Sequence, residues 1–195
     1  MMNVIHSSNN PDLSPETITT LRITDGALLL VDAVEGVSMQ TETFLRYALQ
    51  EKVKSVLVLN KVDMAILGQK FDGEALYQSF AHVIQKTNDV LATFQFKEMG
   101  NNIFDPVIGN VAFGSGKDEW GFTLNRFARM YAKKFELSEE AMLKKLWGDH
   151  FYDETDKKWK TEGLSENKQP LKRAFVQLIM DPICRLYQSI LNGKK

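Results

Sequence analysis

The chain has 195 residues, of which 44% are hydrophobic and 25% charged, and its formal net charge is −1. This composition is typical of one ordinary globular domain, or of one domain with a small insert. A single cysteine, Cys184, excludes an internal disulfide framework, and no His and Cys cluster has metal-ligand spacing. The longest apolar stretch, Ala27 to Asp32, is far shorter than a membrane span, so we expect a cytoplasmic protein without a membrane segment.

Two continuous apolar runs in the first third of the chain predict buried strands. They are Ala27 to Val31 and Ser55 to Leu59, and each leads into a polar loop. Continuous rather than alternating apolar character indicates strands buried on both faces, as in a parallel sheet. Between the runs, apolar residues from Phe44 to Val53 recur at helical spacing. The resulting strand, helix and strand unit predicts an α/β fold.

The same alternation continues for one more unit. Apolar positions from Leu76 to Ile84 predict an amphipathic helix, and Pro106 to Phe113 is predicted as a third strand that runs into a glycine loop. In such sheets ligands bind at the carboxyl ends of the strands. The loops that begin at Asp32, Asn60 and Gly114 are therefore expected to lie on one side of the sheet.

Beyond Gly121 the pattern changes, and we place a subdomain boundary there. Two helices are predicted first, the second with Ser138 as its N-cap. A hairpin over 150–161 and a polar loop over 162–170 follow. The run Ala174 to Met180 is a candidate strand, and Asp181 and Pro182 are predicted as the N-cap and first residue of a last helix.

A sharp local motif follows the second predicted strand: Asn60, Lys61, Val62 and Asp63. Guanine presents two neighbouring donors that one carboxylate can accept together, whereas adenine does not. Asp63 would accept both, Asn60 would contact the base edge and brace the loop, and the Lys61 stem would lie over the ring. The alternative is a simple turn after a strand.

The loop after the third predicted strand supports the guanine interpretation. Gly114, Ser115 and Gly116 are small enough for backbone N–H groups to approach the guanine oxygen. A phosphate loop is not indicated, because the position five before Gly116 is Val111 and the chain has no Gly-x-x-x-x-Gly-Lys-Ser/Thr. The candidate guanine-binding residues are thus Asn60, Lys61, Asp63, Ser115 and Gly116.

Several segments together resemble the elongation factor 2 family of translational GTPases. They are LRITDGALLLVDAVEGVSMQTETFLR, LVLNKVD, GNVAFGSG, LKKLWGD and LIMDPI, in this order and spacing. The resemblance implies an incomplete P-loop GTPase-type parallel sheet flanked by helices, with a small α+β G-prime insert. It implies the C-terminal half of the GTP-binding domain at 1–121, the insert at 122–177 and a closing helix at 178–195.

The resemblance also implies that the catalytic machinery is degenerate in this chain. The family's γ-phosphate motif, Asp-x-Pro-Gly-His, aligns with His6 to Asn10, so that Asn10 occupies the catalytic histidine position and His6 that of the magnesium-linked aspartate. The family's phosphate loop and Mg²⁺ site are expected to be absent here. We therefore expect weak or lost GTP and GDP binding, no catalytic residue, no hydrolysis by this chain alone, and an exposed apolar patch on the sheet.

The partners that the resemblance implies are guanine nucleotide, the ribosome and the ribosomal stalk. Lysines and arginines alternate with acidic residues and form no run, so no sequence-specific nucleic-acid partner is predicted. Two alternatives to a degenerate translation elongation GTPase remain open. One is a non-enzymatic ribosome or stalk interaction module, and the other is an inactive truncated gene copy.

Overall fold

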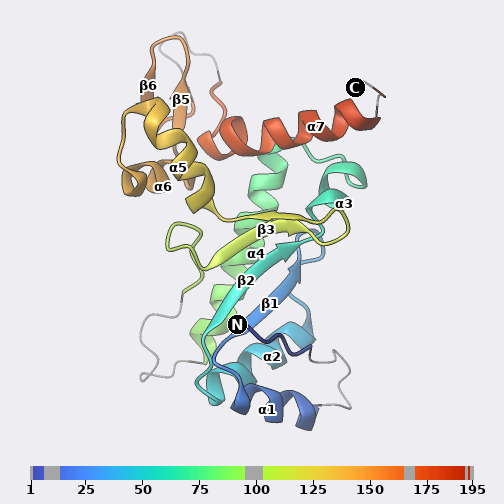
Figure 1. Ribbon diagram of the computed structural model, residues 1–195. Helices are drawn as coiled ribbons and strands as arrows, with labels where there is room; N and C mark the ends of the chain where they lie inside the picture. Colours follow the sequence, from blue (N-terminus) through green and yellow to red (C-terminus); the bar gives the residue numbers. More distant parts are fainter. Residues whose placement is uncertain (1, 7–13, 95–102, 165–169, 192, 194–195) are drawn as a thin grey trace.

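A four-stranded sheet organises the fold in the computed structural model, which describes residues 2–6, 14–94, 103–164, 170–191 and 193 (Figure 1). The strand order is β1-β2-β3-β4, and β1 to β3 are parallel whereas β4 runs antiparallel to β3. This arrangement confirms the predicted α/β class with a mostly parallel sheet. The four strands are β1 (Ala27–Asp32), β2 (Ser55–Asn60), β3 (Val111–Ser115) and β4 (Trp120–Phe122).

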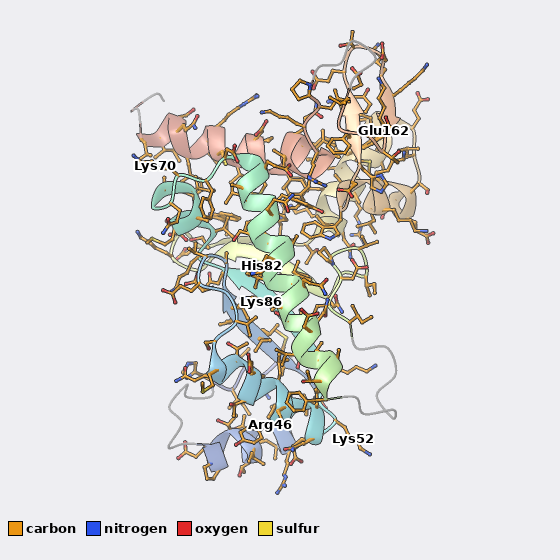
Figure 2. All side chains as sticks on the ribbon, turned by 180° about the vertical axis from the view of Figure 1, so that it is seen from behind. Arg46, Lys52, Lys70, His82, Lys86 and Glu162 are labelled. Carbon is orange, nitrogen blue, oxygen red and sulfur yellow. The ribbon has the colours of Figure 1, made fainter. Side chains whose placement is uncertain are left out.

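Helices cover one face of this sheet. The predicted crossover helices are α2 (Met39–Gln50) and α4 (Gly73–Thr93), and both begin at side-chain caps, Ser38 and Asp72. Figure 2 shows α4 running along the back of the sheet, with α2 beside its lower end. Two further helices were not predicted. They are α1 (Ser14–Ile23), which packs on α2, and α3 (Val62–Leu67), which follows β2.

The opposite face of the sheet is uncovered in the described part of the chain. Along β1, Leu29 and Val31 are buried, whereas Leu28 and Leu30 are 62% and 64% exposed. Figure 1 shows this face toward the viewer with no helix in front of β1 and β2. The expected exposed apolar patch on the sheet is therefore present, and Val56 of β2 belongs to it with 37% exposure.

The second subdomain follows β4. It consists of α5 (Leu124–Phe135), α6 (Glu139–Leu146) and a hairpin of β5 (Phe151–Asp153) and β6 (Lys158–Lys160). Ser138 caps α6 by accepting the N–H of Ala141, as predicted, and the predicted hairpin is confirmed. Most of the predicted polar loop, residues 165–169, lies outside the described residues.

The predicted strand Ala174 to Met180 is wrong. Residues 174–175 are helical, the π-helical segment η3 spans Val176–Met180, and α7 spans Asp181–Leu191. Asp181 lies inside this continuous helical segment rather than at an N-cap. The run is buried on nearly all sides, so it shows no helical periodicity, and a short apolar run without periodicity cannot be assigned from sequence.

The start of the third strand is also corrected, because β3 begins at Val111 rather than at Pro106. Residues 106–109 form a turn in which the Asp105 carboxylate accepts the N–H of Val107, and Gly109 has a positive φ of 89°. Aspartate, proline and glycine each favour a turn here. The division into 1–121, 122–177 and 178–195 stays a prediction, and its two cut points fall inside β4 and inside the last helical segment.

We predict that two neighbouring leucines of β1 respond very differently to truncation. Leu29→Ala removes a core side chain that is 5% exposed and should lower the free energy of unfolding by about 2–5 kcal/mol. Leu30→Ala alters a side chain on the uncovered face and should stay within about 0.5 kcal/mol. Urea unfolding followed by circular dichroism measures both, and equal losses would show that the second face is covered.

Candidate functional site

The carboxyl ends of the three parallel strands lie at one edge of the sheet, as the sequence predicted. Asp32, the last residue of β1, pairs in register with Asn60, the last residue of β2, and Leu59 pairs with Phe113 of β3. The loops that begin at Asp32, Asn60 and Gly114 therefore leave the sheet side by side. All five predicted guanine-binding residues belong to two of these loops.

Lys61 connects β2 to α3 in a left-handed backbone conformation, with φ 61° and ψ 33°. Its Nζ lies 2.7 Å from Oδ2 of Asp32. The other oxygen of Asp32 accepts the N–H groups of Val34 at 2.7 Å and Glu35 at 3.1 Å. The first strand's loop thus fixes the direction in which the Lys61 side chain extends.

The charge of Asp32 follows from these contacts. Burial alone would raise the pKa of Asp32, but the bonds from Lys61 and from the N–H groups of Val34 and Glu35 outweigh it, so the pKa lies below its ordinary value. The same ion pair raises the pKa of Lys61. Asp32 was not among the predicted site residues, and its position at a strand end was the signal that could have identified it.

Asn60 joins the second loop to the third. Its Oδ1 accepts the backbone N–H of Gly116 at 2.8 Å. Gly116 begins the turn between β3 and β4, and in this turn the N–H of Asp118 donates to Oγ of Ser115 at 3.1 Å. Ser115 is buried whereas Gly116 is exposed, so the hydroxyl holds the turn from inside and the glycine backbone faces outward.

Asp63 is the second residue of α3 and is only 2% exposed. Its Oδ1 is buried and has no hydrogen-bond partner in the described part of the chain. A buried acceptor without a donor is uncommon and costs free energy, so such an atom in a loop cluster indicates a missing donor. The two donors on the edge of guanine are the chemistry that this carboxylate fits.

Other predicted positions are not part of this cluster. Asn10 lies outside the described residues, and His6 is exposed near the N-terminus. Across the described ranges, no three His, Cys, Asp or Glu side chains are placed to hold a metal ion. The helices of these ranges include none that is long and apolar enough to cross a membrane.

Comparison with known families identifies the domain to which these loops belong. Residues 2–181 match the model of the elongation factor Tu GTP-binding domain. The chain belongs to this family of translational GTPase domains. The match covers the sheet, both loops and the second subdomain.

Within this GTP-binding domain, the close approach of β3 and β4 requires a glycine at position 114. A Cβ there would lie 2.4 Å from the carbonyl oxygen of Trp120, and backbone atoms cannot yield without separating the strands. We predict that Gly114→Ala lowers the free energy of unfolding by about 1–3 kcal/mol. Gly116→Ala is the matched control, because its Cβ would meet only the Asn60 side chain, at 3.5 Å. Equal effects in urea unfolding would contradict this prediction.

A second prediction concerns pH. Because the pKa of Asp32 is lowered in the folded state, its stabilisation is present above the ordinary value of 3.8 and is lost as the pH falls through the lower folded value. Asp32→Asn should therefore be less stable than the parent chain at pH 7, and the difference should shrink below pH 3.8. Urea unfolding of both proteins between pH 7 and pH 2 measures this, and a constant difference would refute it.

Proposed function

We propose that this chain is the guanine-reading part of an elongation factor 2-like GTPase domain that acts in translation elongation, in a degenerate form. The observation that carries the proposal is the unpartnered Oδ1 of Asp63 next to the braced Asn60 and Gly116 loops. The family match and the resemblance of LVLNKVD and GNVAFGSG to the family's base-reading segments support it.

In the proposed complex the carboxylate of Asp63 accepts the N1–H and exocyclic amine of guanine. Asn60 contacts the base edge while its Oδ1 accepts the N–H of Gly116 and holds the turn. The small residues of the turn let the guanine oxygen approach its backbone. The Lys61 stem covers one face of the base, with its ammonium group held by Asp32. Adenine presents an acceptor at N1 and lacks the amine, so Asp63 would disfavour it.

The 195 residues contain base contacts but no phosphate loop. Backbone nests at phosphate loops and helix N-termini supply much of the binding energy for nucleoside phosphates. We therefore propose that this chain by itself binds GTP or GDP weakly and does not hydrolyse GTP, with Asn10 at the position of the family's catalytic histidine. No step is assigned to Mg²⁺ here.

The proposed partners are the ribosome and its stalk, in the cytoplasm. This part of the proposal rests on the resemblance of the segments on both sides of the insert to elongation factor 2. The family match supports a translational GTPase domain in general.

A non-enzymatic interaction module is the second candidate function, and the construction of the second subdomain favours it. Phe135 of α5 packs on Tyr152 and Trp159 of the hairpin, with ring centroids 4.8 and 5.4 Å apart, and Lys145 lies 4.6 Å from the Trp159 ring. This subdomain thus has its own aromatic packing, and in this candidate function it contacts the ribosome or stalk without nucleotide.

The two candidates differ in base preference, which Asp63→Asn tests. We predict that GTP outcompetes ATP on the parent chain and that Asp63→Asn abolishes this preference, with a loss of about 1.5–3 kcal/mol in guanine binding. Asp89→Asn, at an exposed acid of α4, is the matched control and should keep the preference. Competition measured by saturation-transfer NMR suits weak binding. Equal competition by ATP and GTP on the parent chain would refute guanine recognition and favour the interaction module.

A further inference from the structure

A polar contact between α7 and the turn after β3 has no role in the function described so far. Tyr187 of α7 accepts the indole N–H of Trp120 at 2.7 Å and donates its hydroxyl to Oδ2 of Asp118 at 2.5 Å. Asp118 lies in the turn that also contains Ser115 and Gly116. The last helix thus touches the proposed guanine loop directly, across 67 residues of sequence.

We propose that Tyr187 is a positioning residue that holds the Ser115–Trp120 turn in its guanine-binding conformation through Asp118 and Trp120. The proposal rests on the proposed guanine-binding function of this turn. The turn is held from two sides. Asn60 of β2 binds it at Gly116, and Tyr187 of α7 binds it at Asp118 and Trp120.

Aromatic packing around Trp120 connects Tyr187 to the core of the sheet. The Trp120 ring is stacked near Phe122, with centroids 6.1 Å apart, and Phe122 stacks on the fully buried Phe113 at 5.5 Å. Tyr187 packs against Trp120 at 6.4 Å. The hydroxyl of Tyr187 is therefore anchored through rings that reach the core of the sheet.

No residue of α7 is fully buried, but its first turns are attached: Ile183 and Cys184 pack partly buried against the core. Farther along the helix, Leu186 and Ile190 are 61% and 66% exposed. Figure 1 shows α7 passing above the end of the sheet where β2 leads into α3. A helix without a buried face takes its position from its first residues and from a few specific contacts, so the Tyr187 contacts are well placed to determine where α7 and the turn lie.

The Tyr187 hydroxyl is in its neutral form, which can both donate and accept a hydrogen bond. Burial, the hydrogen bond to Asp118 and the nearby charge of Asp63 together raise the pKa of Tyr187 to about 12. The hydroxyl therefore remains protonated throughout the physiological range. It can donate to Asp118 and accept from Trp120 at the same time.

Loss of this contact should affect guanine recognition more than stability. Hydrogen bonds to the base depend on donor and acceptor direction, so a loosened turn weakens guanine contacts while leaving non-specific nucleotide contacts unchanged. Tyr187→Phe removes both hydroxyl bonds, from Trp120 and to Asp118, and should reduce the preference for GDP over ADP by about fivefold. Tyr131→Phe is the control, because it removes a tyrosine hydroxyl bond that joins α5 to the Leu178 carbonyl of η3, at 2.9 Å, and does not involve the Ser115–Trp120 turn.

Asp118 provides a rescue test. Asp118→Asn keeps an oxygen that accepts the Tyr187 hydroxyl, so it should retain most of the preference for GDP over ADP. Asp118→Ala removes this acceptor, so it should reduce the preference about as much as Tyr187→Phe. The double variant Tyr187→Phe with Asp118→Ala should lose no more preference than Tyr187→Phe alone, because Tyr187→Phe already removes the bond to Asp118.

The experiment uses NMR on the full chain, with and without nucleotide. Without nucleotide, Tyr187→Phe should shift the Trp120 indole and Gly116 amide signals, and Tyr131→Phe should leave them in place. With nucleotide, GDP and ADP titrations give the base preference. A parent chain without guanine preference would refute the proposed function, whereas the signal shifts would still report the contact. A preference that survives both Tyr187→Phe and Asp118→Ala, or unshifted signals in Tyr187→Phe, would overturn the positioning role.

Discussion

The parallel register of β1, β2 and β3 is the constraint on which the site depends. Because Asp32 lies opposite Asn60 and β3 continues the same direction, three loops leave one edge of the sheet together. Two side-chain contacts then join them: Lys61 to Asp32 and Asn60 to the Gly116 backbone. A shift of one residue in either strand pair would turn these side chains to the other face and separate the loops.

The same sheet has one buried face and one uncovered face, and this asymmetry shapes the molecule. Alternate residues of β1 either pack against α2 and α4 or lie exposed, although the strand sequence is continuously apolar. Continuous apolar strands are suited to a sheet covered on both sides. Burying the uncovered apolar side chains, which include Leu28 and Leu30, under a further layer of protein would stabilise the sheet.

The unpartnered oxygen of Asp63 lies near a turn that has several hydrogen bonds. Asn60, Ser115 and the Tyr187 contact to Asp118 hold this turn in a structure without ligand. Asp63 retains an acceptor that the described part of the chain does not satisfy. A turn that is held before binding lowers the entropy cost of ordering it around a ligand. A ligand that supplies hydrogen-bond donors would satisfy the free acceptor of Asp63 and gain binding free energy.

The sequence by itself determined the α/β class, the crossover helices, the hairpin and the two loops with Asn60, Asp63 and Gly116. Apolar runs, helical periodicity and turn residues act locally, and each leaves a readable pattern. The tertiary structure alone decided the π-helical segment at Val176–Met180, the strand β4 and the contacts of Asp32 and Tyr187. The π-helical segment is buried on nearly all sides, β4 is only three residues long, and the contacts of Asp32 and Tyr187 join residues distant in the chain. None of these features leaves a periodic signal in a single sequence.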